Sequence, residues 1–436
     1  MQLWGKKVGK AMKTAALKKH TRKLITLIVL VCMGVVITGQ PVLSDEPEQI
    51  PESLNDVVAK GKLSGVFKTL YYQRAFDGDT PDWSTLAIGG NFNYETVPIY
   101  GFTAGIGFKT SQGDYLDSDN EVYRGILAMG ATPKDDESYT ALDEYFLRYT
   151  NWDTQATLGA HAVNTPWLHR HDIRMTPKKY RGFGLINNSI ENVELHGYYL
   201  THWLGWTAEE WESITSAFTG DTGDDEGALA GGAKWQILSA MNIQAWDYYY
   251  NDIMNSFYLS ADYTHTIDDD YILGADLRYL NQTDVGDKLA GNISTYTTGG
   301  YAFLGGYGAT LSLYYGTNGS DDLRVPFGNS KIISLQVLEL DRAEEDAYAI
   351  KLGYAFDSLG LEGLGANVIY GSFDTPDTGA NASPDATEFD FDLYYKLGGW
   401  FKLMSIRLRH AIINEDEGVD GGEDFTDSRL YLVYKF

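Results

Sequence analysis

The chain has 436 residues, with 34 Lys and Arg against 60 Asp and Glu, which gives a formal net charge of −26 at pH 7. So large a negative excess argues against nucleic acid as a partner. Tyr (31) and Gly (47) are frequent, Pro (11) is rare, and 14% of the residues are aromatic. An aromatic excess combined with polar/apolar alternation is typical of a transmembrane β-barrel.

Residues 1–44 have the features of a secretory signal. A basic stretch without acids, Lys6–Lys23, precedes an apolar run, Leu24–Gly39, and small residues at Val42 and Ser44 precede an acidic segment. The apolar run has about 16 residues, fewer than the ~20 that a spanning helix needs. We therefore expect cleavage after residue 44; a retained anchor is the alternative. The single cysteine, Cys32, lies in this run, so we expect a mature chain without disulfides.

The rest of the sequence predicts an all-β fold: a transmembrane antiparallel barrel with an inward-folded constriction loop. Residues 45–60 are expected to form a short periplasmic lead-in with a helical turn, and residues 61–436 a single barrel domain. Past residue 44 no apolar run reaches the length of a spanning helix. Eighteen strand-like runs are separated by turn residues. They are 61–73, 84–95, 100–110, 140–150, 154–163, 180–190, 192–202, 230–239, 241–250, 254–265, 270–281, 293–304, 307–316, 345–356, 361–371, 386–397, 400–410 and 425–436.

Tight and long connections alternate along the chain. An even strand number places both termini on the periplasmic side, and short turns opposite long loops are typical of outer-membrane barrels. The tight connections are predicted at 151–153, 191, 240, 305–306, 358–360 and 399. The long ones are predicted at 111–139, 164–179, 203–229, 317–344, 373–384 and 412–424.

Alternation also assigns the two faces of the wall. In the last run, Leu430, Leu432 and Tyr434 share one parity, while Asp427 and Arg429 share the other. A charge that faces lipid at mid-depth costs ~2–4 kcal/mol, so the charged parity is predicted to face a wet lumen. A soluble barrel with the charges outside is excluded, because an eighteen-stranded ring is too wide to fill with side chains.

The chain ends in Phe436, with aromatic or aliphatic residues at every second position before it. This ending is similar to the C-terminal signal that outer-membrane proteins present to the barrel-assembly machinery. We therefore expect that machinery, outer-membrane lipid and lipopolysaccharide as partners, and the bacterial cell outer membrane as the location.

Positive charge gathers in one stretch of this acidic chain, residues 164–183. The order Leu158-Gly159, Thr165-Pro166, Asp172-Ile173-Arg174-Met175-Thr176-Pro177 and Tyr180-Arg181-Gly182 resembles a segment of the OprD-type porins, the outer-membrane carboxylate channels. Ala160-His161 follows Leu-Gly, where that family often has Arg-Gln. This departure removes one expected pore cation and leaves the substrate preference open.

The resemblance implies a pore narrowed by a cationic loop, with a ladder of basic residues on its wall, through which small carboxylates, amino acids or peptides pass by diffusion. A constriction lined with cations concentrates anions, and the planar fork of Arg suits carboxylates. The predicted constriction residues are Arg170, Asp172, Arg174, Lys178, Lys179 and Arg181. The predicted ladder residues are Arg148, Arg278, Lys351, Arg407, Arg409 and Arg429. A structural role is the alternative for the ladder, since Asp276 lies beside Arg278 and Asp427 beside Arg429.

Other functions have weaker support. A barrel enzyme, a protease or lipase, would need a catalytic His with an acid or Ser, and His171-Asp172 is the one local pair. An adhesin or structural barrel is a further alternative. No closed ligand spacing predicts a metal site, and no cofactor is expected. The acid-rich segments 221–226, 268–270 and 415–424 are interpreted as solvated loops rather than Ca²⁺ sites. The oligomeric state is left open between a monomer and a homotrimer.

Overall fold

The computed structural model describes residues 53–113, 120–123, 125–129, 131–220, 227–268, 270–328, 330–416 and 422–436. The predicted signal segment 1–44, the acidic segment 221–226 and part of the segment 415–424 lie outside the described residues. No helix among the described residues is long and apolar enough to span a membrane.

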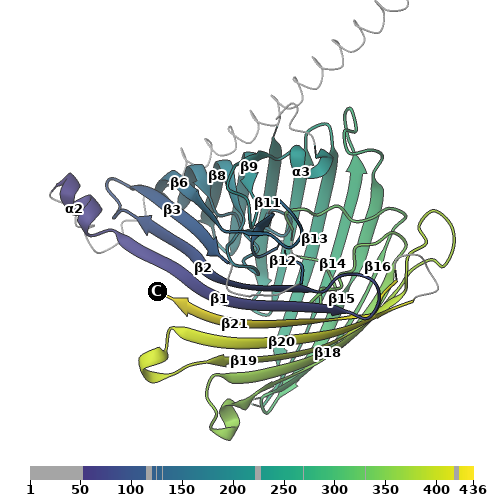
Figure 1. Cartoon of the computed structure of the whole chain (residues 1–436). Helices are drawn as coiled ribbons and strands as arrows, with labels where there is room; N and C mark the ends of the chain where they lie inside the picture. Colours follow the sequence, from purple (N-terminus) through teal and green to yellow (C-terminus); the bar gives the residue numbers. More distant parts are fainter. Residues whose placement is uncertain are drawn as a thin grey trace, which may run out of the picture.

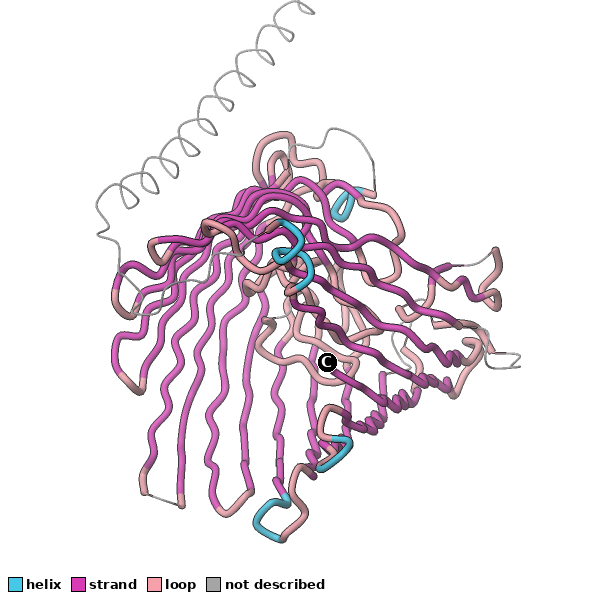
Figure 2. The backbone as a smooth tube through the Cα atoms, turned by 90° about the vertical axis from the view of Figure 1, so that its left-hand side faces the viewer, coloured by secondary structure: helices cyan, strands magenta, loops and turns pink. Residues whose placement is uncertain are grey.

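The described strands form one closed antiparallel barrel of 18 strands (Figures 1 and 2). This confirms the predicted fold class and strand number. The barrel strands are β1 (Lys62–Phe76), β2 (Trp83–Glu95), β3 (Phe102–Gln112), β6 (Tyr139–Asn151), β7 (Thr154–His161), β8 (Lys179–Ile190), β9 (Val193–Leu204), β11 (Ala228–Leu238), β12 (Met241–Tyr250), β13 (Met254–Thr266), β14 (Tyr271–Asp284), β15 (Ser294–Gly306), β16 (Ala309–Asn318), β17 (Asp346–Ala355), β18 (Leu364–Asp374), β19 (Ala386–Lys396), β20 (Met404–Glu415) and β21 (Phe425–Lys435).

Short helices and two-residue strands lie in the connections outside the barrel strands. The helix α2 (Leu54–Ala59) lies where the sequence predicts a helical turn, and the side chain of Ser53 caps its N-terminus. The remaining elements are β4 (Ala128–Met129), β5 (Asp136–Glu137), β10 (Glu212–Ser213), α3 (Ser216–Thr219), η1 (Phe356–Leu359) and η2 (Gly399–Phe401). The two-residue strand β10 pairs with β9, while β4 and β5 pair with each other.

The barrel closes where the first strand meets the last. Strand β1 pairs with β2 on one side and with β21 on the other, from Val66 opposite Lys435 to Phe76 opposite Phe425. The backbone N–H of Gly65 donates to the carbonyl of Phe436 at 2.9 Å. Closure leaves no sheet edge exposed to lipid, where an unpaired backbone group would be costly.

Burial confirms the predicted faces. Leu430, Leu432 and Tyr434 point outward, with exposed fractions of 38–44%, whereas Asp427 (0%) and Arg429 (3%) point inward and are buried. The exposed residues form the apolar surface that lipid covers, because charged side chains are avoided there.

The two ends of the barrel differ as predicted. At the end that holds Lys62 and Phe436, strands are joined by short turns, such as residues 152–153 and 191–192. At the far end lie the long connections, including 113–138, 162–178, 205–227 and 319–345. Connection 251–253 is short although it lies at the far end.

One side of the lumen is apolar, which the alternation pattern had not indicated. Trp246 and Tyr248 of β12 pack in one cluster with Trp167, Leu168 and Phe327, which come from two long connections. Tyr258 of the same cluster meets Trp167 in an edge contact at 5.9 Å. Large aromatic rings fill this part of the barrel, so any aqueous passage must follow the opposite wall.

Candidate pore constriction

Two long connections fold into the lumen, where loop segments are visible inside the ring of strands (Figure 2). We call them the first inward loop (162–178, between β7 and β8) and the second inward loop (319–345, between β16 and β17). Lys68, buried on the inner face of β1, donates through Nζ to Asp172 at 2.5 Å and to the carbonyl of Arg174 at 2.8 Å. Since β2, β3 and β6 lie between β1 and β7, the first inward loop must reach inside the barrel to make this contact.

The first part of this loop is anchored on the apolar side. The Thr165 N–H donates to the carbonyl of Leu168 at 2.8 Å, and the Tyr248 hydroxyl donates to Thr165 Oγ1 at 3.1 Å. Trp167 and Leu168 are buried. The Thr-Pro-Trp-Leu portion therefore fixes the loop to β12, and the cationic portion that follows is carried toward β1.

Arg174 is held between two aromatic rings. Its guanidinium carbon lies 4.8 Å from the ring centroid of Tyr123 and 5.4 Å from that of Trp206. Trp206 is itself bound to the loop, because its Nε1 donates to the His171 carbonyl at 2.8 Å and its own carbonyl accepts from Thr176 at 2.7 Å. A cation over an aromatic face is stabilised by the ring quadrupole. Three connections thus fix the position of one guanidinium.

The other cations of the first inward loop have partners. Arg170 lies 3.2 Å from Asp172. Lys178 is buried, donates to the carbonyl of Pro326 at 2.7 Å and lies 4.2 Å above the ring of Trp206. Burial, with weaker repulsion from other cations, lowers the pKa of Lys178 to about 8. Lys178 also joins the two inward loops, since Pro326 belongs to the second.

Lys179 lies in the barrel wall. Its side chain is 2% exposed and contacts Glu144 at 2.5 Å and Asp143 at 3.8 Å. A register shift in β6 opposite Gly107 and Phe108 turns both acids inward. The charge of Lys179 is therefore balanced within the wall, and we leave it out of the functional proposal.

Arg181 faces outward, which corrects its predicted place in the constriction. Along β7 and β8, Arg181 pairs with Ala160, two positions from the pair Phe183–Leu158, whose side chains are exposed on the outer face. Residues two apart on a strand share a face. The pairing of β8 with β7 ends at Tyr180, so the side chain of Lys179, beyond that end, can reach the inward-facing acids of β6. Arg181 lies 5.8 Å from the ring centroid of Trp211. Sequence reasoning assigned Arg181 to the constriction although it lies in the predicted strand 180–190, because the face of this strand on which it lies was not considered.

Most residues of the predicted ladder face inward and bind acids. Arg148 lies 3.2 Å from Glu95, Arg278 lies 2.6 Å from Asp276, and Arg429 lies 2.6 Å from Asp427. Pairs of this kind stiffen the wall and neutralise much of its charge, as the structural alternative predicts.

The remaining ladder residues lie on β17 and β20. Arg407 forms a bidentate pair with Asp392, and Arg409 lies 3.7 Å from the same acid. Arg409 is directly opposite Arg429 across β20 and β21, so positive charge is concentrated there. Lys351 lies opposite Ser312, which is buried on the inner face of β16.

Sequence reasoning missed several cations. Lys68 and Arg74 of β1 face inward, and Arg74 pairs with Asp427 at 2.8 Å. Alternation could have indicated that both cations face the lumen, because they lie at even spacing on one face of β1. The structure places Leu70 and Tyr72 on the same face, and both are buried. Lys331 in the second inward loop binds Glu339 and Asp341. No sequence pattern indicates that this loop enters the lumen.

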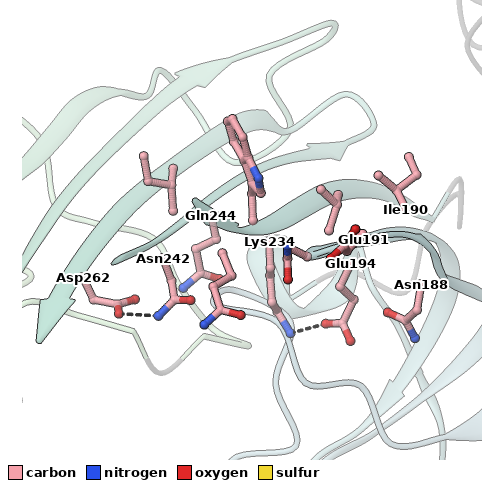
Figure 3. A pocket seen from close by; sticks show the side chains of 13 residues that line it. Asn188, Ile190, Glu191, Glu194, Lys234, Asn242, Gln244 and Asp262 are labelled. Atoms are coloured by element: carbon pink, nitrogen blue, oxygen red, sulfur yellow. Dashed lines mark hydrogen bonds and ion pairs between the residues drawn. The ribbon is translucent and has the colours of Figure 1, made fainter. Parts of the chain in front are cut away.

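A polar pocket of about 500 Å³ lies at the short-turn end of the barrel (Figure 3). Lys234 donates to Glu194 at 2.7 Å, and Asn242 donates to Asp262 at 2.8 Å, as the dashed lines show (Figure 3). His196 also contacts Glu194, at 2.6 Å. These groups make the pocket a polar vestibule, in which Glu191 and Asp262 have no ion-pair partner among the described residues.

The His171-Asp172 pair does not form a catalytic arrangement. The Asp172 carboxylate binds Lys68 and Arg170, and His171 Nδ1 has no hydrogen-bond partner among the described residues. The oriented acid–histidine contact that a hydrolase needs is thus missing between His171 and Asp172. In the described part of the chain, no group of three or more His, Cys, Asp or Glu side chains could hold a metal ion.

Comparisons with known proteins agree with this architecture. A family model described as "outer membrane porin, OprD family" matches residues 101–436. Porin D of Pseudomonas aeruginosa is 24% identical over 252 residues, which are 55% of this chain and 54% of that protein, so the match spans about half of the relative.

Solved structures share the fold. OccK9 (OpdG) of Pseudomonas aeruginosa superposes with a TM-score of 0.78 at 21% identity, over 87% of this chain and 99% of that one. OccAB3 of Acinetobacter baumannii gives 0.78 at 19% identity, over 87% and 100%. OpdK of Pseudomonas aeruginosa, in a structure with vanillate, gives 0.76 at 20% identity, over 87% and 99%.

Proposed function

Because the chain belongs to the OprD family of outer membrane porins, we propose that it is a passive channel for small hydrophilic solutes, with a preference for anions such as carboxylates, amino acids or small peptides. Solutes cross between the first inward loop and the charged wall formed by β1 and β17–β21. They leave through the polar vestibule at the short-turn end.

One observation carries this proposal: the state of Arg174. Its guanidinium has no ion-pair partner among the described residues, whereas Arg148, Arg278 and Arg429 each have one. Tyr123 and Trp206 fix its plane, so little conformational freedom is lost when it donates two parallel hydrogen bonds to a carboxylate. Lys68 of β1 donates to the carbonyl of Arg174 at 2.8 Å and so helps to fix this residue in place.

The flanking rings extend the proposal to aromatic carboxylates. A ring that enters beside Arg174 can pack against the edges of Tyr123 and Trp206 while its carboxylate meets the guanidinium. Tyr72 already stacks on Tyr123 at 3.9 Å, so that face of Tyr123 is covered. The structural relative OpdK was solved with vanillate, an aromatic carboxylate, which is consistent with such a solute class for this fold.

Reversal potentials in a planar bilayer under a KCl gradient test the proposal. The wild-type protein should show open steps with anion preference, and Arg174→Ala should weaken that preference. Arg181→Ala is the matched control: it removes the same charge from the outer face of the same segment and should leave the potential unchanged.

Other outcomes would overturn part or all of this reading. Cation preference of the wild-type channel would contradict the cationic constriction. Absence of steps from a folded, heat-modifiable barrel would contradict the channel itself and favour an enzyme or adhesin.

The outer surface supports the proposed partners. Phe436 stacks on Tyr434 at 5.7 Å and lies 5.9 Å from Phe92, with its ring exposed at the end of the closing strands. Such a terminal aromatic is available to the barrel-assembly machinery during insertion. Exposed aromatic and aliphatic side chains around the barrel suit contact with lipid and lipopolysaccharide.

A further inference from the structure

Three consecutive backbone N–H groups of the second inward loop point at two carboxylates of β19. The N–H of Gln336 donates to Asp390 Oδ2 at 3.0 Å. The N–H groups of Val337 and Leu338 donate to the two oxygens of Glu388, at 2.9 and 2.6 Å. We call Glu388 and Asp390 the carboxylate clasp and residues 336–338 the loop tip.

Strand β21, which is separated from β19 by β20, completes the contact. Gln336 Nε2 donates to the carbonyl and to Oδ1 of Asp427, at 2.7 and 2.8 Å, and Arg429 donates to the Gln336 carbonyl at 3.2 Å. Val337 and Leu338 pack against a small apolar cluster on β20 and β21. The loop tip is thus bound across three strands, β19 to β21, and β18 separates them from β17, the strand that follows the loop.

The clasp carboxylates depend on the loop. Glu388 and Asp390 are 0% and 1% exposed, and neither has an ion-pair partner among the described residues. A buried carboxylate without a cation is costly unless several donors satisfy it. The three N–H groups of the loop tip satisfy three of the four carboxylate oxygens, and Asp390 Oδ1 has no hydrogen-bond partner among the described residues. Asp427, by contrast, already has Arg74 and Arg429 as partners.

The rest of the second inward loop connects its tip to the first inward loop and the constriction. Lys331 precedes the tip in the sequence and binds Glu339 and Asp341, which follow it. The Lys331 carbonyl accepts a hydrogen bond from Arg278 at 3.0 Å. Toward the start of the loop, the Phe327 carbonyl accepts from the N–H of His169 in the first inward loop at 3.1 Å. A displaced tip would therefore free the segment that narrows the lumen.

We propose that Glu388 and Asp390 are positioning residues that hold the second inward loop across the lumen and thereby set the largest solute that passes. This inference rests on the proposed channel function. It concerns the width of the passage, not its charge preference. The clasp grips main-chain groups, so it acts whatever side chains the tip carries.

The test combines single-channel conductance with liposome swelling in solutes of graded size. Glu388→Ala plus Asp390→Ala should raise the conductance and shift the size limit to larger solutes. Asp392→Asn is the matched control. The Asp392 carboxylate lies on the same face of the same strand, but it binds Arg407 and not the loop. This control should alter the reversal potential and leave the size limit unchanged.

A loop-shortened background separates positioning from general damage to the wall. In a protein whose residues 332–340 are replaced by a short Gly-Ser linker, the size limit should already be high. Removing the clasp there should have no further effect. Heat-modifiable mobility verifies that each variant is a folded barrel.

Two results would overturn the inference: an unchanged size limit in the folded clasp variant, or an effect of equal size in the loop-shortened background. Both presuppose that the wild-type protein conducts. A wild-type protein that does not conduct would refute the proposed channel function instead, so the two failures are distinguishable.

Discussion

The two inward loops are tied to the wall by opposite chemistry. At the first inward loop the wall donates, because Lys68 of β1 binds the side chain of Asp172 and a carbonyl. At the tip of the second, the wall mainly accepts: Glu388 and Asp390 of β19 bind three backbone N–H groups, and Arg429 of β21 donates to one carbonyl. A tether through a side chain depends on one residue type in the loop, whereas a tether through the main chain does not.

The difference also separates the proposed roles. The first inward loop carries Arg174, whose charge is not paired within the described residues, so it governs which charge passes. The second inward loop carries Lys331 already bound to two acids, so it contributes mainly volume. Three sets of variants test this difference. They change the contact of the first loop with the wall, the contact of the second loop with the wall, and the lysine between the two loops.

The largest effect is expected from Lys68→Met. It leaves Asp172, whose side chain is 22% exposed, without its closest cation, and breaking a largely buried pair from one side should cost about 2–3 kcal/mol of unfolding free energy. The loop should also lose its fixed position, so anion preference should fall. Denaturant titration of the folded barrel and reversal potentials measure the two effects.

Two variants serve as controls for this prediction. Lys62→Met removes an exposed lysine from the same strand and should change neither quantity. Lys68→Met combined with Asp172→Leu should recover much of the stability, because no charge is then left unpaired. It should not restore anion preference. Full stability of Lys68→Met alone would show that the first tether is dispensable.

A smaller effect is expected from Gln336→Ala. The change removes the two hydrogen bonds of the Gln336 amide to Asp427 but keeps the three backbone N–H groups in the clasp. The expected cost is about 0.5–1.5 kcal/mol, with an unchanged size limit in liposome swelling. A size limit that rises as far as in the clasp variant would show that the side chain, not the main chain, holds the loop.

The smallest effect is expected from pH, through the lysine that joins the loops. Lys178 has a pKa lowered to about 8 by burial, so its charge is present below that value and is lost as pH rises through it. Anion preference should therefore decline modestly between pH 7 and 9. Burial lowers the pKa of His171 to about 4, so this histidine stays neutral over the range.

Lys178→Arg is the control for the pH experiment, because a guanidinium remains charged throughout the range. Its reversal potential should be flat from pH 7 to 9. An equal decline in this variant would assign the titration to another group.

Much of the architecture could be predicted because its signals are local. The alternation of Leu430, Leu432 and Tyr434 with Asp427 and Arg429 assigned both faces of β21 correctly, and the spacing of turn residues gave the strand number and the sidedness of the loops. The segment around Asp172 and Arg174 indicated the family that the comparisons identify. Each of these features can be recognised in residues that lie close together in the sequence. The alternation, in particular, follows from the pleat, which points successive side chains to opposite faces.

The site could be predicted only in part. Arg174 lies in the inward loop as the segment suggested, but Arg181 faces outward because it shares the face of exposed Phe183 on β8. Lys179 is neutralised by two acids that a register shift turns inward. Lys68 was missed although its parity was readable. Strand ends and register shifts depend on pairing partners far along the chain, so local patterns do not reveal them.

The sequence by itself determined a closed barrel with a charged interior, because a period of two and the cost of charge in lipid leave one solution. The tertiary structure alone decided which cations stay unpaired and where the second inward loop rests. That loop is held largely through main-chain N–H groups, which every residue except proline possesses. No residue type in the loop tip therefore predicts the contact. It forms only when β19, β20 and β21 have paired in the folded barrel.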